Sequence, residues 1–510
     1  MKKIIVLLFL SIGFLSQSVL AQNSAGSSLT SIKKMIETKQ YAAAIPQLFT
    51  LGYQKKNMKI EQIALARYWL GLSLYNTGYS QLASYPLVSA SQLNKGSISQ
   101  KALALLVRIS DKDKDNTILD YAIKKIEISQ ISNLGKELFY SKLAESHINN
   151  NDDKSAEVEL NNALVVNPKN YYANYNMGLI FLKRNEPRKA YKYFEKNFQN
   201  TTGGEKKVLA NISIARTLYQ AKMWPEAVDF YKDIPKNHEL YKNALFEQAW
   251  AQFRDLRFRA ALSTIENLQT PFYDTYFDPE SLLLRIIILL YVCHVDDLES
   301  SVIAYEKNFR PISKLLSDWE VDKKTQAANL KLISEADTNL KYTQAGLQKK
   351  YESKIPFFIM RTALSSPYLK THLQNFKTIQ AEKNKFRKTM LAKNKSFSIF
   401  AERVFSNRIK TVQKKMSDGF SRYIVQTKKQ MDDYNQQFDL VKYEALNVRK
   451  NYFKLTSTMS EEEKAKLTSV ADKRDFYTEN GYRYWPFEGE YWIDEIGNYQ
   501  FIGQNRCVNE

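Results

Sequence analysis

Apolar residues recur every three to four positions along most of the chain, the period of amphipathic α-helices, and the pattern itself repeats. Residues 138–170 and 171–198 align with each other without a gap. Four alanines hold the same slot in successive units and stand 34, 37 and 34 residues apart: Ala156, Ala190, Ala227 and Ala261. A period near 34 residues is that of a helix–turn–helix unit, which stacks on its neighbours to bury a continuous core. This part of the chain is therefore predicted to be all-α.

Small and bulky residues occupy fixed slots within each unit, and helix packing explains why. Gly178 and Ala190 are expected at the helix crossing, where small side chains allow close approach, and the larger Phe181 and Phe194 between one pair and the next. This pattern resembles the tetratricopeptide repeat (TPR) family. The resemblance implies a superhelical solenoid with a concave groove and no chemistry of its own. About seven helix pairs are expected over residues 28–310.

The resemblance also indicates which residues face the groove, because the first helix of each TPR pair lines it. The corresponding positions here are Tyr172, Tyr175, Lys183, Arg216, Tyr219, Phe246, Trp250, Phe253 and Arg254. Aromatic rings interleaved with Arg and Lys suit a partner peptide that carries acidic and apolar side chains. The alternative is that these rings pack on a neighbouring helix or on the C-terminal half of the same chain.

The repeat is lost after Pro311, and residues 311–475 are predicted to form an arm of long helices. Prolines at 356 and 367 interrupt the arm, whereas residues 369–458 contain no proline. A coiled-coil-like a/d seam follows, made of Ile424, Met431, Phe438 and Ala445 with Tyr434, Val441 and Val448 between them. Such a seam fits helices folded back on the solenoid or self-association with another chain. A third interpretation is a basic helix that lies on a membrane.

The chain ends on a segment of a different kind, in which aromatic residues alternate with acids and glycines. Residues 490–494 and 498–502 are predicted to form two strands of a β-hairpin, with Gly497 supplying the positive φ of the turn. Since an isolated hairpin of this size is marginal in water, residues 480–507 are expected to cap the solenoid or the long helices. The functional alternative is a docking tag for a partner.

Residues 1–21 are typical of a cleavable signal peptide. Lys2 and Lys3 precede the apolar stretch Ile4–Leu15, and Val19–Ala21 offers a cleavage site. No cysteine follows the apolar stretch, so we expect a periplasmic protein rather than a lipoprotein. In an oxidising compartment Cys293 and Cys507, the two cysteines of the chain, are predicted to form a disulfide, and two free thiols are the alternative.

The net charge of +20 points to anionic counterparts. For an exported protein these are envelope polymers, lipid headgroups or acidic protein faces, and nucleic acid is not expected. A solvated basic surface is the simpler interpretation. No histidine and cysteine cluster has metal-ligand spacing, and no glycine-rich phosphate loop is present. We therefore predict no enzyme activity, no catalytic residue, no metal and no cofactor, and no later segment is long and apolar enough for a transmembrane helix.

The ending "WPFEGEYWIDEIGNY…RC", together with the repeats, resembles periplasmic TPR components of the Myxococcus-type adventurous gliding machinery and related envelope TPR proteins. The resemblance implies a Gram-negative envelope scaffold in a multiprotein complex, with a role in gliding motility. The predicted function is a non-catalytic periplasmic scaffold for protein–protein interactions. The alternative is a recruiter or regulator of cell-wall enzymes that binds peptidoglycan or its hydrolases.

Overall fold

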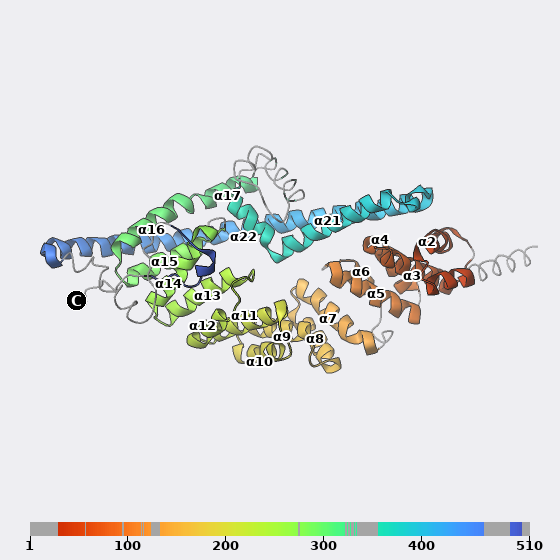
Figure 1. Cartoon of the computed structure of the whole chain (residues 1–510), viewed down its shortest axis with the longest axis horizontal. Coiled ribbons are helices and arrows are strands. Elements are labelled where there is room, and N and C mark those ends of the chain that lie inside the picture. Colours follow the sequence, from red (N-terminus) through yellow and green to blue (C-terminus); the bar gives the residue numbers. More distant parts are fainter. Residues whose placement is uncertain are drawn as a thin grey trace, which may run out of the picture. The chain divides into compact units, whose positions relative to one another are not determined.

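Helices dominate the computed structural model (Figure 1), which describes residues 29–56, 58–93, 96–113, 115, 117–123, 133–273, 276–321, 324, 327, 331, 333, 355–463 and 490–501. Among these residues there is no strand, so the fold is all-α as predicted. The chain divides into two compact units. Unit 1 is Met1–Ala173 with Pro367–Asp418, and unit 2 is Asn174–Ser366 with Gly419–Glu510. The dividing points fall within helices α9 (Tyr171–Lys183) and α22 (Lys395–Ser457).

Unit 1 is built from helices that pack on their neighbours in sequence. Its elements are α2 (Tyr41–Phe49), η1 (Thr50–Gln54), α3 (Ile60–Asn76), α4 (Ser80–Leu93), α5 (Ser97–Asp113), α6 (Thr117–Ile123), α7 (Asn133–Asn149), α8 (Asp153–Val166), α21 (Pro367–Arg387) and η4 (Met390–Lys393). Close packing joins α3 to α4, α4 to α5 and α7 to α8. The first part of α22 adds aromatic side chains, with Phe397 against Phe49 at a ring-centroid distance of 5.1 Å.

Unit 2 continues the same architecture. Its elements are α10 (Pro187–Gln199), α11 (Gly204–Gln220), α12 (Trp224–Lys232), α13 (Tyr241–Arg254), α14 (Phe258–Leu268), η3 (Pro271–Tyr273), α15 (Pro279–Tyr291), α16 (Val295–Asn308), α17 (Ile312–Val321), α20 (Phe357–Ser365) and η5 (Ile493–Glu495). Helix α15 begins where the Asp278 carboxylate accepts the Ser281 N–H and Pro279 takes the first helical position. Ile286, Ile288 and Leu289 are fully buried, as expected for this apolar stretch.

The repeat pattern describes the helix crossings correctly. The marker alanines Ala156, Ala190, Ala227 and Ala261 have no exposed surface. A Cβ added at Gly178 would lie 2.5 Å from the ring of Phe194, so these two helices approach as closely as a glycine allows. Consecutive helix pairs of this kind make a helical solenoid, and this confirms the fold class predicted from the sequence.

One turn recurs between the two helices of a pair, and the sequence gave no clear signal of it. Its key residue has positive φ at Lys39, Gly78, Asn151, Asn185, Lys222, Leu256 and Cys293. At each of these turns the next N–H reaches back five residues, for example from Asp152 to the His147 carbonyl at 3.0 Å. This is the Schellman helix end, which satisfies carbonyls that the helix leaves open. Glycine is the usual residue there, but it stands at only one of these seven positions.

The seam predicted on the long arm is buried within this chain. Helix α22 has 63 residues, and Ile424, Met431 and Phe438 on it are fully buried. Phe438 and Ala445 belong to the same apolar core as Tyr305 of α16. These seam positions are therefore covered by the solenoid of unit 2, which confirms the folded-back interpretation for this segment.

The predicted β-hairpin is wrong for the described part of the tail. Residues 493–495 form a 3₁₀ turn, and the residues around it are not paired as strands. The Tyr499 hydroxyl accepts the Trp492 N–H at 2.8 Å and donates to the Trp492 carbonyl at 3.2 Å, where a hairpin would use backbone groups. Gly497 does have the predicted positive φ, at +96°.

The tail instead binds α14 through an asparagine. The Asn267 amide accepts the N–H groups of Gly497 and Tyr499 at 2.5 and 3.1 Å and donates to the Tyr499 carbonyl at 3.0 Å. Two residues later the Phe501 N–H donates to the Ser263 hydroxyl at 3.0 Å, and the Phe501 ring is buried in the core of unit 2. These bonds, made by a helix rather than by a second strand, explain why the alternating pattern did not produce a hairpin.

Several predictions lie outside the described residues. These are the signal peptide at residues 1–21, the segment 464–489 with Trp485 and Phe487, and Cys507. Within the described part, no helix combines the length and the apolar character needed to cross a bilayer.

Candidate functional site

A cavity of about 450 Å³ opens on the solenoid of unit 2. Its lining residues come from four helices, α11, α12, α13 and α15, and are Arg216, Tyr219, Tyr231, Glu247, Trp250, Arg254 and Glu280. Four of them, Arg216, Tyr219, Trp250 and Arg254, are among the groove residues predicted from the repeat. Residues that lie up to 38 positions apart in the sequence thus meet at one opening, because stacking places the first helices of adjacent pairs side by side.

One side of the cavity is a neutralised ion pair. The Arg216 guanidinium donates two hydrogen bonds to the Glu247 carboxylate, at 2.8 and 2.6 Å. The hydrogen bond to Glu247 is the main cause that raises the pKa of Arg216. Burial first, and then the Glu247 charge, raise the pKa of the Tyr231 hydroxyl, which also bonds to Glu247. These three side chains satisfy one another, so they give this side its shape rather than a free charge.

The opposite side carries a cation that is still available. The Arg254 guanidinium lies 5.8 Å from the centre of the Trp250 ring and is exposed to solvent. Arg254 forms no ion pair with any residue in the described part of the chain. The Trp250 ring is half-buried and packs against Phe253, with the ring centroids 5.8 Å apart. A cation beside an indole face can hold a carboxylate while the ring contacts an apolar neighbour.

The long arm closes one edge of the cavity. The Tyr434 hydroxyl on α22 donates to the Glu280 carboxylate at 2.6 Å. Burial first, and then the Glu280 charge, raise the pKa of Tyr434 well above its ordinary value. Glu280 stands in the first turn of α15, where the helix dipole also favours a negative charge. The second acidic residue of the cavity is therefore already held by the protein itself.

The remaining predicted groove residues do not line the cavity. Tyr172 belongs to unit 1, where its hydroxyl bonds to Glu145 and burial raises its pKa. Tyr175 packs edge-on against Phe194, with ring centroids 5.8 Å apart. Lys183 is exposed at the end of α9, and Phe246 is half-buried on α13.

Phe253 behaves as the alternative interpretation described. Its ring is surrounded by aromatic neighbours from the next helices and lies 5.8 Å from Phe258 and 5.7 Å from Tyr291. It contributes to the packing between helix pairs.

Sequence reasoning missed Tyr231, Glu247 and Glu280. Glu247 is three residues before Trp250 and seven before Arg254, so all three share one helix face. Extending the groove stripe to acidic residues of α13 would have found Glu247. Tyr231 was assigned to a packing slot, and its hydroxyl reaches the cavity from there.

No group of three or more histidine, cysteine, aspartate or glutamate side chains is arranged to hold a metal ion within the described residues. The imidazole of His147 lies 3.4 Å from the Asp152 carboxylate, across the turn that joins α7 and α8.

Comparisons with known proteins place the chain near few others. No family model matches it, and no curated protein matches it. Among solved structures, a tetratricopeptide repeat protein from Parabacteroides merdae is 13% identical, with 56% of this chain and 93% of that chain covered and a TM-score of 0.27. The TPR domain of P58(IPK) is 14% identical, with 76% of this chain and 99% of that chain covered and a TM-score of 0.19.

Proposed function

We propose that this chain is a non-catalytic scaffold of the cell envelope that holds protein partners through the cavity between α11 and α13. The observation that carries the proposal is the meeting of Tyr219, Trp250 and Arg254 at one opening, with the Arg254 cation unpaired in the described structure. Trp, Tyr and Arg are the residues that most often dominate the binding energy of protein interfaces.

The chemistry of the cavity favours a particular kind of partner segment. Because Arg216 is paired with Glu247, and Tyr434 is bonded to Glu280, Arg254 is the charge best placed to meet a ligand. We infer a peptide in which a carboxylate lies next to an apolar or aromatic side chain. The carboxylate would bond to Arg254, and the apolar side chain would lie against Trp250 and Tyr219.

The cellular setting is part of the same proposal. The signal-peptide pattern of residues 1–21 supports export to the periplasm, where the partners would be envelope proteins. The resemblance of the chain's ending to gliding-machinery proteins supports a motility complex as one such setting.

The test compares single variants of the full-length chain, because truncation after Pro311 would strip α22 from the core around Tyr305. Tagged wild type, Arg254→Glu and Trp250→Ala would be used for affinity capture from envelope extract, with partners quantified by mass spectrometry. Lys232→Glu on α12 is the matched charge reversal, since Lys232 is exposed and does not line the cavity. We expect Arg254→Glu to lose partners that Lys232→Glu retains. Equal capture by all the variants, with unchanged circular dichroism, would reject the cavity as the binding site.

The net charge of +20 favours a second candidate function, a recruiter of cell-wall enzymes that binds peptidoglycan. Sedimentation of the pure protein with isolated cell wall separates the two functions. Binding that is lost between about 50 and 300 mM salt would support the recruiter, because exposed charges are screened over this range. Protein partners retained at high salt would support the scaffold.

A further inference from the structure

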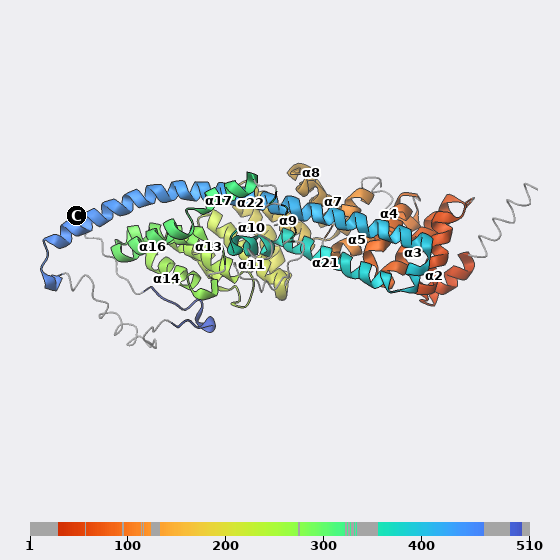
Figure 2. The same cartoon turned by 90° about the horizontal axis from the view of Figure 1, so that it is seen from above.

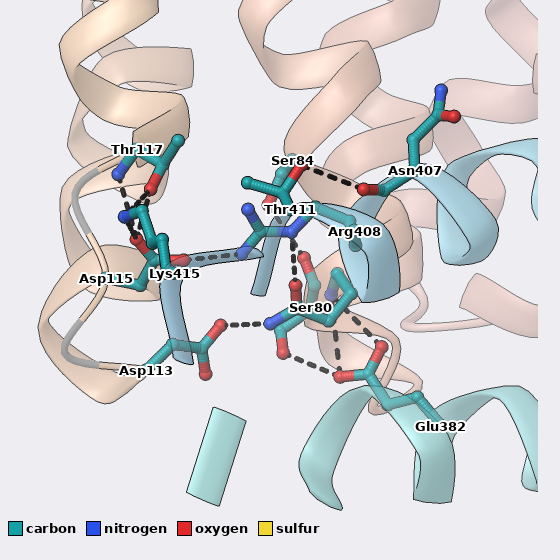
Figure 3. A network of polar contacts seen from close by, with 11 residues as sticks. Ser80, Ser84, Asp113, Asp115, Thr117, Glu382, Asn407, Arg408, Thr411 and Lys415 are labelled. Carbon is teal, nitrogen blue, oxygen red and sulfur yellow. Dashed lines mark hydrogen bonds and ion pairs between the residues drawn. The ribbon is translucent and has the colours of Figure 1, made fainter. Parts of the chain in front are cut away.

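A buried carboxylate in unit 1 joins a helix of the arm to the beginning of the solenoid. Glu382 on α21 is only 7% exposed. It accepts the Ser80 hydroxyl at 2.7 Å and the Gln81 N–H at 3.1 Å, both at the N-terminus of α4 (Figure 3). Glu382 is therefore the polar contact through which α21 closes the first turn of α4.

A second carboxylate lies on the far side of Gln81. The Gln81 side-chain amide donates to Asp113 of α5 at 2.5 Å, and its oxygen accepts the Arg408 guanidinium of α22 at 2.9 Å. Arg408 also donates to Asp115 at 2.9 Å. The charge of Arg408 is thus committed to Asp115, and it reaches Glu382 only through the neutral Gln81 amide.

Other charged groups face Glu382 more weakly. Lys112 of α5 is near enough to favour the charged form, and Asp113 opposes it. On α21 itself, Lys385 turns away, since its ammonium donates to the Thr77 carbonyl at 3.0 Å and lies over the Tyr79 ring. Among the described residues Glu382 has no ion-pair partner.

Burial, the largest effect, raises the pKa of Glu382 to about 7. The bonds from Ser80 and Gln81 act in the opposite direction. When α21 leaves its place, this carboxyl returns to its ordinary value near 4.5. Between these two values the docked state holds a proton that the undocked state releases. By linkage, docking is strongest below about pH 4.5 and weakens as the pH rises through 7.

The geometry accommodates this proton without loss of contacts. A hydroxyl group is both donor and acceptor, so Ser80 can accept an O–H from protonated Glu382 as readily as it donates to the carboxylate. The other carboxyl oxygen can still accept the Gln81 N–H. Protonation therefore removes a buried charge beside Asp113 and keeps both hydrogen bonds.

We propose that the contact of Glu382 with Ser80 and Gln81 is a proton-sensitive latch, which holds α21 on α4 more firmly at mildly acidic pH than above neutrality. The latch is a property of unit 1 and does not depend on the cavity in unit 2.

Hydrogen exchange of the full-length chain tests the latch. Exchange of peptides from the start of α4 and from α21 would be followed by mass spectrometry at pH 5.5 and 8.0 and corrected for the intrinsic chemical rate. We expect protection in the wild type to fall on the order of tenfold between these pH values. Glu382→Gln, which keeps the shape and both bonds without ionising, should be protected equally at both.

Two controls make the outcome specific. Glu402→Gln removes a carboxylate on α22 whose bond to Arg387 and other cations lower its pKa, so it is ionised throughout and its loss should leave the pH dependence intact. Asp113→Asn asks whether the neighbouring acid is the titrating group. The proposal is overturned if the wild type shows no pH dependence, if Glu382→Gln retains it, or if Asp113→Asn alone abolishes it.

Discussion

Phe438 of α22 and Tyr305 of α16 lie face to face, with ring centroids 4.3 Å apart and ring planes inclined by 17°. Both rings are fully buried. Polar contacts flank this pair, including Arg310 to Asp439 at 2.7 Å and Lys442 to Glu306 at 2.5 Å. The seam of the long helix is therefore complementary to the end of the solenoid in both shape and charge.

Truncating Phe438 should open this seam. Phe438→Ala removes a buried ring and leaves a cavity, so we expect a loss of about 3–5 kcal/mol in the stability of unit 2. Urea unfolding, with hydrogen exchange of α16 as the local readout, measures it. Leu440→Ala, two residues away and 72% exposed, should change stability by less than about 0.5 kcal/mol. If Phe438→Ala instead dissociated an oligomer and left α16 protected, the seam would serve a second chain.

The repeat could be predicted from sequence because its signals are local. Alanine at Ala156 and Ala190 leaves no choice at a helix crossing, and four such positions at a regular spacing establish the period. The heptad pattern on α22 was equally clear, but it cannot name its partner. An a/d seam buries the same residues against a second chain or against its own solenoid.

The parts that sequence missed depend on contacts between distant residues. Alternating aromatic residues around Trp492 and Tyr499 predict strands, but no local rule reveals that Asn267, more than 200 residues earlier, takes the backbone bonds. In the cavity, Arg254 was found because aromatic and basic residues marked the groove. Glu247 was missed because its importance comes from Arg216, which lies one helix pair away.

Two aspartates only two residues apart should respond differently to neutralisation. Arg408 and Lys415 bond to Asp115, and although burial alone would raise its pKa, these charges hold it well below the ordinary value. Asp115→Asn leaves Arg408 buried without a counter-charge, so we expect a loss of about 3–5 kcal/mol at pH 7. Burial raises the pKa of Asp113, so Asp113→Asn should cost less than about 1 kcal/mol.

The pH dependence provides an internal check on this pair. A depressed pKa contributes stability that is fully present above the ordinary value of 3.8 and is lost as the pH falls below it. The difference in unfolding free energy between wild type and Asp115→Asn should therefore be constant from pH 5 to 8 and should shrink toward pH 3. A difference that stays constant down to pH 3 would contradict the assigned ion pair.

The predicted disulfide between Cys293 and Cys507 has a testable consequence. The Phe501 ring packs on His294 at a centroid distance of 5.2 Å, and His294 is the next residue after Cys293. The six residues from Phe501 to Cys507 can span at most about 20 Å, so the two cysteines are within reach of each other. We expect no free thiol in unreduced protein and a loss of about 2–4 kcal/mol on reduction. Two thiols per chain in freshly purified, unreduced protein would contradict the pairing.

Gly497 should be the most sensitive position of the docked tail. Its φ of +96° disfavours any side chain, and a Cβ there would lie 2.3 Å from the Tyr241 hydroxyl oxygen. We expect Gly497→Ala to cost about 1–3 kcal/mol of local stability and to release residues 490–501 from Asn267. Hydrogen exchange of this segment in the full-length chain measures the release.

Two companion variants separate strain from collision at Gly497. Tyr241→Phe in the Gly497→Ala background removes the hydroxyl that the new methyl group meets, so it should restore part of the protection but not the part lost to the positive φ. Gly203→Ala, at a site where an added Cβ meets no atom within 4 Å, should leave the tail protected. If Gly497→Ala alone left exchange unchanged, the bonds from Asn267 would not depend on this turn, and the buried Phe501 ring would be the main anchor of the tail.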